Sequence, residues 1–384
     1  MDFSRVIGQK HLKSHLLKTV ENDRIPHAQL FVGASGSGVL PMAIAYAQEV
    51  LCSRHEKGSQ SFERCVSNIK NLAHPDLHFV YPVNSSSPTT KKPISAHFTA
   101  EWRKFVLKNP YASLFDWLKF IGVENKQGNI SVYEAKDMLS KLALKSYEGG
   151  FKVMIIWMAD KMNVECSNKI LKIIEEPPSQ TLLLLLTEAE ENILSTIKSR
   201  CQKLEFAKLS EDEIATELIN NYDALEQNAK KISHRAEGDV NKAIHILHND
   251  SDDILFEEWF ISWVRVAFKA RGNKGAINEL LHWSESLAAK GRETQKKFIS
   301  YCTEVFRQAL LKNYKADSLL FYEFSDAKFS LEKFAPFIHQ NNIFEISAAL
   351  EEASYHISRN GNGKIIFTDL SIKLTRLIHK KESA

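Results

Sequence analysis

Residues 27–40 read HAQLFVGASGSGVL. His27–Val32 is a short, mostly apolar run, which predicts a buried strand. Gly33, Gly36 and Gly38 follow and permit a tight turn at the start of a helix. Pro41 falls in the first helical turn, where its missing N–H costs nothing. Apolar residues that suit a packed helix come next: Met42, Ile44, Ala45, Ala47, Val50 and Leu51. The order strand, glycine turn, helix is typical of a nucleotide-binding α/β core.

The turn itself lacks the groups that handle a nucleotide. A phosphate loop ends in Gly-Lys-Ser/Thr, where the lysine reaches the β- and γ-phosphates and the hydroxyl binds Mg²⁺. In this chain Val39 replaces the lysine and Leu40 replaces the hydroxyl residue. The glycines can therefore shape the loop, but no side chain at these two positions can neutralise a triphosphate.

A second apolar run, Val153–Met158, predicts another strand of the same core. In an ATPase such a strand ends in an acidic pair, of which one carboxylate serves Mg²⁺ and the other orients the attacking water. Trp157 and Met158 occupy those positions, and Asp160 is out of register with them. We interpret Asp160 as a turn or helix-cap residue. Two sets of ATP-handling residues are missing, which predicts a chain that does not hydrolyse ATP.

The stretch 152–178, KVMIIWMADKMNVECSNKILKIIEEPP, resembles the core of AAA+ clamp-loader subunits. Further motifs match that family in order and spacing: Ile7-Gly8-Gln9, His74-Pro75-Asp76, Glu175-Glu176-Pro177-Pro178 and Thr196–Cys201. The resemblance covers roughly the first 250 residues. Because Ser199-Arg200-Cys201 is present while the ATP residues are lost, the resemblance implies a non-hydrolysing subunit. An active gamma/tau-like subunit would carry Gly-Lys-Thr and Asp-Glu instead.

The resemblance also implies a role for Arg200. In this family the arginine of Ser-Arg-Cys projects into the ATP site of a neighbouring subunit. A guanidinium is always charged and forks onto phosphate oxygens, so it can stabilise charge during γ-phosphate transfer. Such a residue needs no ATP in its own subunit. Ser199 and Cys201 are its motif neighbours, and the alternative is a surface or helix-capping arginine.

A third nucleotide contact is also missing. The lid of the family begins a helix with Gly-x-x-Arg, whereas the matching segment, Gly238–Asn241, ends in Asn241. Asp239, which follows the glycine, is predicted to cap the next helix at its N-terminus.

The cysteines are Cys52, Cys65, Cys166, Cys201 and Cys302. They form no paired framework, and no signal peptide is recognisable, so disulfides are not expected. Bacterial relatives hold a structural zinc with four cysteines. Aligned on His74-Pro75-Asp76, this chain offers Cys52, Phe62, Cys65 and Asn68. A tetrahedral site needs four ligands. His55 and His74 could complete a Cys₂His₂ set, but we favour two free cysteines and expect neither metal nor cofactor.

The fold class expected is an α/β AAA+ core with a parallel sheet and flanking helices over residues 1–205, a small helical lid over 206–250, and an all-α collar domain over 251–384. Ser210 and Glu213 have the spacing of a capping box that opens the lid. The polar stretch Asn84–Pro93 predicts an exposed loop, and the acidic residues 249–253 mark a boundary.

The segment 95–127 is rich in aromatic residues, which either stack on nucleic-acid bases or, as we favour, pack in the core. Five of its aromatic residues are Trp102, Phe105, Phe115, Trp117 and Phe120.

The 384 residues carry 50 basic and 47 acidic side chains, a net charge of +3, which argues against strong autonomous nucleic-acid binding. No apolar run reaches membrane-spanning length.

The resemblance implies a cytoplasmic, nucleoid-associated subunit of the bacterial replicative polymerase assembly that is not itself an ATPase. Its partners would be gamma/tau-like ATPases and delta and, through the assembly, the sliding clamp and primed DNA. The alternatives are an ATP-hydrolysing gamma/tau-like motor and a stand-alone nucleic-acid-binding protein.

Overall fold

A computed structural model describes residues 2–84, 92–124, 126–248, 251–316, 319–320, 324 and 329–381, with the backbone alone for 251–253. Most of the expected loop Asn84–Pro93, and the boundary at 249–250, lie outside the described residues. Contacts divide the chain into two compact units, Met1–Val123 with Gly128–His245, and Glu124–Gln127 with Ile246–Ala384. The first unit contains both the expected core and nearly all of the expected lid, so the division into three domains stays a prediction.

The first unit is built on a five-stranded sheet in which every pair of neighbours is parallel. The strands are β1 (Ala28–Gly33), β2 (Leu77–Val80), β3 (Lys152–Ile156), β4 (Thr181–Thr187) and β5 (Gln202–Phe206), in the order β2-β3-β4-β1-β5. The strands predicted from the apolar runs are therefore confirmed. Because the carboxyl ends of parallel strands meet at one edge, the ends of β1, β3 and β4 lie together, where α/β sheets bind ligands.

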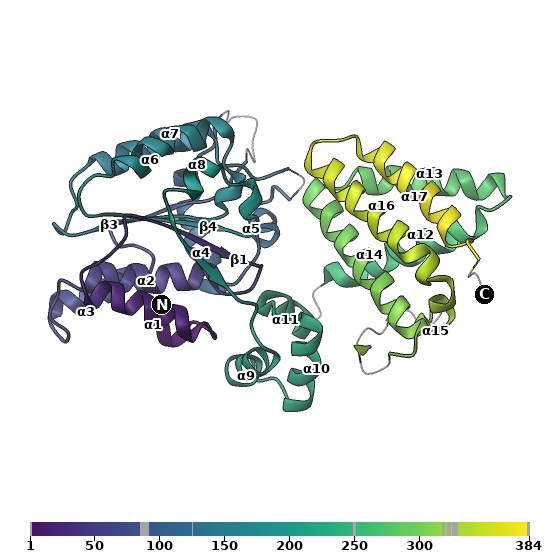
Figure 1. The fold of residues 1–384 in the computed structure, drawn as a ribbon, viewed down its shortest axis with the longest axis horizontal. Helices are drawn as coiled ribbons and strands as arrows, with labels where there is room; N and C mark the ends of the chain where they lie inside the picture. The colour runs from purple at the N-terminus through teal and green to yellow at the C-terminus, as the bar shows by residue number, and fades with distance from the viewer. Residues whose placement is uncertain are drawn as a thin grey trace. The chain divides into compact units, whose positions relative to one another are not determined.

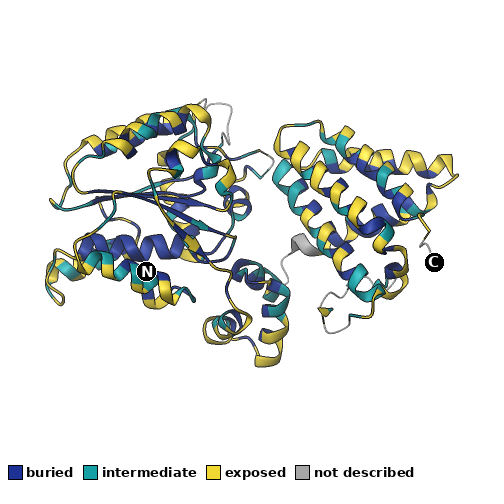
Figure 2. Ribbon diagram, viewed as in Figure 1, coloured by how far each residue is buried: buried dark blue, intermediate teal, exposed yellow. Residues whose placement is uncertain are grey.

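Helices cover both faces of this sheet (Figure 1). One side carries α1 (Lys10–Glu21), α2 (Val39–Cys52) and α3 (Gln60–Lys70), and the other carries α6 (Val132–Ala143) and α7 (Val164–Glu175). Side chains alternate between the two faces along β4: Leu182, Leu184 and Leu186 pack in the core with α2, and Leu183 and Leu185 pack with α6 and α7. Strands β3 and β4 are accordingly buried along their whole length, β1 and β2 are buried or half-buried, and only β5 has exposed residues (Figure 2).

The aromatic segment forms α4 (Thr99–Lys108) and α5 (Leu114–Phe120) and joins the same core as α2. Trp102 and Trp117 are buried, with ring centroids 5.2 Å apart, and Tyr81 stacks on Trp102 at 4.0 Å. Of the five aromatic residues named above for this segment, only Phe120 is exposed. Core packing is thus confirmed over base stacking for the buried members.

After β5 the chain is helical. In the first unit α9 (Glu211–Tyr222), α10 (Glu226–Ala236) and α11 (Val240–Leu247) follow, and α9 opens with the predicted capping box of Ser210 and Glu213. The second unit has its own core, to which Phe260, Trp263, Phe298 and Phe306 contribute. Its α-helices are α12 (Ser251–Lys269), α13 (Lys274–Ala288), α14 (Arg292–Asn313), α15 (Leu331–Phe334), α16 (Gln340–Ser358) and α17 (Gly363–Leu377).

The predicted fold class is confirmed: a parallel α/β core with flanking helices, then a small helical region and an all-α unit. Among the described residues, no helix has both the length and the apolar character needed to cross a membrane.

Candidate functional site

The glycine turn follows β1 and leads into α2, as the sequence predicts. Gly36 (φ 69°) and Gly38 (φ 93°) adopt left-handed backbone conformations that other residues rarely take. The Ser37 hydroxyl donates to the Ala34 carbonyl at 2.6 Å, which closes the turn on itself. The loop therefore keeps the local shape of a phosphate loop although its lysine and hydroxyl residue are gone.

The substituted residues have joined the hydrophobic core. Leu40 is buried, and Val39 packs against the core from a partly buried position. Tyr111 lies against Gly38, where an added Cβ would be 3.3 Å from its ring, and its hydroxyl accepts the backbone N–H of Ile7 at 2.8 Å. The Ile7-Gly8-Gln9 motif holds the loop as well, because the Gln9 side-chain amide donates to the Ser37 carbonyl at 3.1 Å.

The hollow over this loop is small. It is bounded by the loop, by Pro110 and Tyr111, and by Trp157, Met158 and Thr187 at the ends of β3 and β4. Its volume is about 30 Å³ for the centres of water molecules, which leaves room for no more than a few waters. Little space for water is therefore left beside the loop.

Trp157 and Met158 follow β3 directly, at the positions predicted for the acidic pair, and both are buried. The Trp157 ring packs on Trp102 with centroids 5.1 Å apart. Asp160 lies in a 3₁₀ turn, where it accepts a hydrogen bond from the Thr187 hydroxyl at 3.0 Å and pairs with Lys161 at 2.6 Å. The turn interpretation of Asp160 is thus confirmed, and its carboxylate ties the end of β4 to the turn after β3.

The N-terminus of α11 lies against the glycine loop. Asp239 caps this helix, as predicted, by accepting the Lys242 backbone N–H at 3.0 Å. The same carboxylate lies against Gly36: a Cβ on that glycine would be 2.0 Å from Asp239 Oδ1. Burial raises the pKa of Asp239, although hydrogen bonds from Lys242 and Ser35 partly offset this effect. The sequence indicated the cap but not this contact, which puts an acidic group of the chain at a loop built to hold anions.

Asn241 is the second residue of α11, is buried and bridges to the aromatic segment. Its side-chain amide donates to the Asp116 carboxylate at 2.8 Å, and its side-chain oxygen accepts from the Asn109 amide, also at 2.8 Å. The residue that replaces the lid arginine therefore serves a contact between helices within the first unit.

Arg200 lies two residues after the end of the short helix α8 (Ser195–Lys198), on the surface of the first unit. Its guanidinium donates to the Thr196 carbonyl at 2.9 Å and pairs with the Glu175 carboxylate, also at 2.9 Å. The two side chains of this ion pair are 41% and 46% exposed. Glu175 is the last residue of α7 and the first of the Glu-Glu-Pro-Pro motif, so the structure joins two motifs that the sequence left separate.

Of the motif neighbours of Arg200, Ser199 is also exposed, whereas Cys201 is partly buried. The Ser199 hydroxyl donates to the Thr196 carbonyl at 3.2 Å, which helps to close the turn. Cys201 is a free thiol in a partly buried position, and burial raises its pKa to about 11. A thiol of that pKa is protonated at neutral pH and so is a poor nucleophile.

The cysteines near the sheet correct one expectation. Cys52 ends α2 and Cys65 lies in α3, with Cα atoms 5.9 Å apart, and the two form a disulfide. The expectation of free thiols at these positions was wrong because these two packed helices bring the pair face to face. Cys166, Cys201 and Cys302 are free, as expected.

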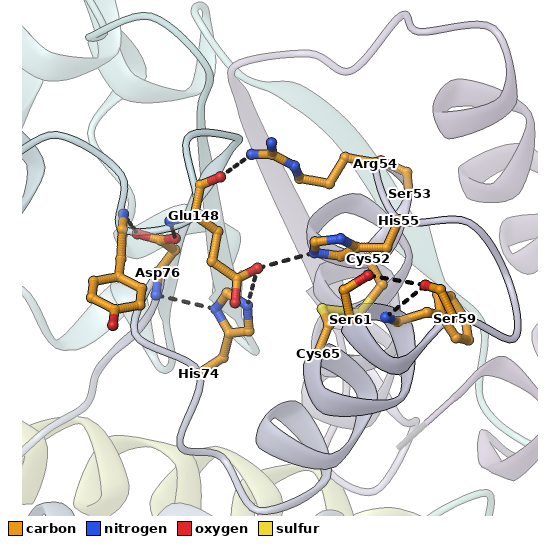
Figure 3. Close-up of polar contacts among 12 residues, drawn as sticks. Cys52, Ser53, Arg54, His55, Ser59, Ser61, Cys65, His74, Asp76 and Glu148 are labelled. Atoms are coloured by element: carbon orange, nitrogen blue, oxygen red, sulfur yellow. Dashed lines mark hydrogen bonds and ion pairs between the residues drawn. A yellow bond between two sulfur atoms is a disulfide. The ribbon is translucent and has the colours of Figure 1, made fainter.

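Side chains distant in sequence surround this cysteine pair (Figure 3). Glu148, in the loop before β3, accepts from His55 Nε2 at 3.1 Å and lies 3.4 Å from His74 Nε2. Burial alone would raise the pKa of Glu148, but the hydrogen bond from His55 and the histidine charges hold it below its ordinary value. Phe62, at a position where relatives have a cysteine, packs against the core instead. The four-cysteine zinc set therefore does not fit this chain.

Comparison with known proteins places these features in a family. Residues 8–210 match the model of the DNA polymerase III, delta subunit, family. A delta-prime subunit from Bacillus subtilis is 29% identical over 244 residues, 63% of this chain and 60% of that protein. A delta-prime subunit from Pseudomonas aeruginosa is 26% identical over 176 residues, 46% of this chain and 41% of that one.

The chain is also similar to a tau subunit. The tau subunit of DNA polymerase III from Bacillus subtilis is 23% identical over 261 residues, 66% of this chain and 39% of the tau protein. The chain thus matches about 40–60% of the length of these relatives. Since the family model covers more than half of the chain, the chain belongs to the DNA polymerase III delta-subunit family, as do the delta-prime proteins it resembles.

Proposed function

We propose that this chain is a non-hydrolysing subunit of a bacterial sliding-clamp loader. In that role it scaffolds the loader and donates Arg200 to the ATP site of a neighbouring ATPase subunit. The assembled loader would open a ring-shaped clamp and place it on primed DNA, with this chain contributing to catalysis only through its neighbour.

The observation that carries the proposal is the position of Arg200. Its guanidinium is exposed at the end of α8 and is held by an equally exposed carboxylate, Glu175. A surface ion pair of this kind contributes only about 0–1 kcal/mol, so exchanging the Glu175 carboxylate for a partner's phosphate costs little. A guanidinium can bind two phosphate oxygens at once and remains charged at any physiological pH. It can therefore stabilise the charge that develops during γ-phosphate transfer.

The condition of the chain's own nucleotide loop supports the same proposal. Val39 and Leu40 replace the cation and the metal-binding hydroxyl, and Trp157 replaces a carboxylate with a buried ring. Asp239 adds a carboxylate at the loop, which would repel a triphosphate. Catalytic help from this chain is then possible only at a site that another subunit provides.

The two alternatives gain less support. An ATP-hydrolysing motor would need the lysine and the acidic pair, and no residue at those positions in this chain can act in their place. A stand-alone nucleic-acid-binding protein would need exposed aromatic or basic side chains, whereas most aromatic residues of the segment 95–127 are in the core.

The proposal is tested in a reconstituted loader that contains the clamp, primed DNA and the partner ATPases. Arg200→Ala should lower clamp-stimulated ATP hydrolysis and clamp loading. Arginine fingers contribute about 10³–10⁵ in rate where they act fully. The loss for the whole loader should be smaller, because other subunits supply arginines to other sites. Arg200→Lys should fail to restore the rate, since an ammonium lacks the planar fork.

Arg24→Ala is the matched control, because Arg24 is an exposed arginine of the same unit. This variant should hydrolyse ATP and load clamps at the wild-type rate. Size-exclusion chromatography should show that the Arg200 variants still assemble. If an assembled Arg200→Ala loader matched the wild type in both assays, the donor role would be wrong and Arg200 would be a structural partner of Glu175.

A further inference from the structure

A single segment, residues 102–116, contacts positions at which the chain has lost its nucleotide-handling residues, and we call it the bridging segment. It comprises most of α4, the turn that follows and the start of α5. At the glycine loop, a Cβ added to Gly38 would be 3.3 Å from the Tyr111 ring. At the end of β3, the Trp102 ring packs on Trp157, with centroids 5.1 Å apart. The same stretch of chain therefore lies on the turn meant for phosphates and on the position of the acidic pair.

A third contact of the bridging segment is to α11, at the position of the lid arginine. Asn241 donates to the Asp116 carboxylate and accepts from the Asn109 amide, each at 2.8 Å. One turn farther along α11, His245 Nε2 lies 3.2 Å from the same carboxylate. Asn241 is 4% exposed, so water has little access to replace its partners. The bridging segment thus joins α11 to the glycine loop and to the end of the sheet.

The hydrogen bonds of this third contact run in one direction, which fixes the orientation of each side chain. A carboxylate only accepts, so Asn241 presents its NH₂ group to Asp116. The Asn241 side-chain oxygen is then left to accept from the NH₂ group of Asn109. The Asn109 side-chain oxygen in turn accepts the backbone N–H of Tyr111 at 3.0 Å. A continuous series of bonds therefore connects α11 to the residue that lies on the glycine loop.

The sequence of the turn explains how Asn109 and Tyr111 come to these positions. A proline disfavours helical backbone in the residue before it, and α4 accordingly ends at Lys108, with Asn109 extended before Pro110. The turn directs Tyr111 toward the glycine loop, where its hydroxyl accepts the backbone N–H of Ile7 at 2.8 Å. One side chain thus contacts both the Ile-Gly-Gln motif and the glycine loop.

The bridging segment is itself fixed to the core of the first unit. Trp102 is buried, and Arg103 Nε donates to the Leu72 carbonyl at 2.9 Å. Directly after the segment, Trp117 is buried and its indole N–H donates to the Pro82 carbonyl at 2.8 Å. Separating α11 from a support fixed in this way would leave buried polar groups without partners, which costs more than the net contribution of the bonds themselves.

We propose that the bridging segment takes the place of a nucleotide as the connection between the core and the lid helices α9, α10 and α11, and holds these helices in one orientation when no ligand is bound. A ligand that fills the space between a loop and a lid contacts both of them. In this chain Tyr111 contacts the loop, and Asn109 and Asp116 contact the lid position Asn241. The inference concerns the lid of this chain and does not rest on the role proposed for Arg200.

Hydrogen exchange of backbone amides, measured on the full chain by mass spectrometry, tests the proposal. Asn241→Ala removes both hydrogen bonds from α11 and should speed exchange by at least about fivefold. The increase should appear in α11, in residues 109–113 and in the glycine loop. Tyr111→Phe keeps the ring but leaves the Ile7 N–H without its acceptor, and it should speed exchange in the same three regions by about threefold or more. Exchange in the second unit should not change.

Two control variants separate this coupling from a general loss of stability. Asn228→Ala makes the same substitution at an exposed position of α10 and should leave exchange in all three regions at the wild-type rate. Ile170→Val shortens a buried side chain of α7, on the other face of the sheet. It should lower the stability of the unit without speeding exchange selectively in α11 or in the glycine loop. Circular dichroism verifies that each variant is folded.

Three results would overturn the proposal. The first is exchange at the wild-type rate in α11 and in the glycine loop of both Asn241→Ala and Tyr111→Phe. The second is an increase confined to the first turn of α11 in Asn241→Ala and to Ile7 in Tyr111→Phe, which would make the contacts independent of each other. The third is an increase spread evenly over the first unit, as in Ile170→Val, which would give the bridging segment no role beyond core packing. Because the two variants change opposite ends of the series of bonds, either one alone decides the outcome if the other fails to fold.

Discussion

The glycine loop after β1 and the Ser-Arg-Cys turn after α8 belong to the same structural unit, but they have changed in opposite ways. At the loop, apolar residues replace the groups that would contact nucleotide, and these residues pack inward. At the turn, Arg200 keeps its charge, its exposure and a weakly held partner. The residues at the chain's own nucleotide loop are therefore part of the hydrophobic core, whereas the outward-facing Arg200 remains available to another molecule.

The largest effect should come from reversing a core substitution. Trp157→Asp would restore an acidic residue at the end of β3, but it removes a ring that is 4% exposed and packs on Trp102. Truncating a buried aromatic residue costs about 3–5 kcal/mol, and burying an unpaired carboxylate adds to that cost. Urea denaturation should show at least this loss, with no gain of ATP hydrolysis.

Phe120→Asp is the matched control, because Phe120 belongs to the same aromatic cluster but is 45% exposed. Its cost should be clearly smaller. A Trp157→Asp protein as stable as the wild type would show that Trp157 is not part of the core as described.

A smaller effect on stability is expected at Asp239, with a size that depends on pH. Burial raises the folded-state pKa of this carboxyl above its unfolded value, so the folded protein binds the proton more tightly. The resulting stabilisation is present at low pH and is lost as the pH rises through the folded pKa. Asn caps a helix as well as Asp does. Asp239→Asn should therefore match the wild type near pH 4 and exceed it in unfolding free energy at pH 7–8.

Thermal unfolding at several pH values measures this difference. Ser210→Asn, which changes another helix cap without removing a charge, supplies the control and should give a difference that is independent of pH. A stability difference for Asp239→Asn that is constant from pH 4 to 8, or that has the opposite sign, would show that the carboxylate at Gly36 is stabilised as an anion.

The smallest effect is expected at the outward-facing site. Glu175→Gln removes the ion pair with Arg200, and exposed pairs contribute about 0–1 kcal/mol. The unfolding free energy should change by less than about 1 kcal/mol, and the reconstituted loader should keep its ATPase rate. A large loss of stability would mean that Arg200 is a structural residue, and a large loss of loader activity alone would make Glu175 part of the catalytic arrangement.

Sequence patterns predicted the elements of this site better than the contacts between them. The strand, turn and helix of residues 27–52 depend on local patterns, namely an apolar run, glycines that permit left-handed backbone and a proline in the first helical turn. The identity of Val39, Leu40 and Trp157 was likewise sufficient to identify the missing chemistry. The predictions of the strand, the turn and the helix held because each depended on residues close together in the chain.

Three contacts were missed because they join segments far apart in sequence. Glu175 and Arg200 were recognised in separate motifs, but nothing in either motif indicates that they pair. The cap residue Asp239 also meets Gly36, which depends on how α11 packs. The Glu148 carboxylate accepts a hydrogen bond from His55, although the sequence pointed only to histidines near the cysteines. The packing of helices and loops around the sheet decides all three.

The most direct test that the glycine loop does not bind nucleotide is a calorimetric titration of the full chain with ATP and Mg²⁺. We expect only heats of dilution, up to ATP concentrations of about 1 mM. Val39 and Trp157 provide neither a cation to bind the phosphates nor a carboxylate to bind the metal. The Val39→Lys variant, which restores the cation alone, should hydrolyse no ATP. Saturable, Mg²⁺-dependent binding at micromolar ATP would contradict this expectation and show that the glycine loop binds nucleotide.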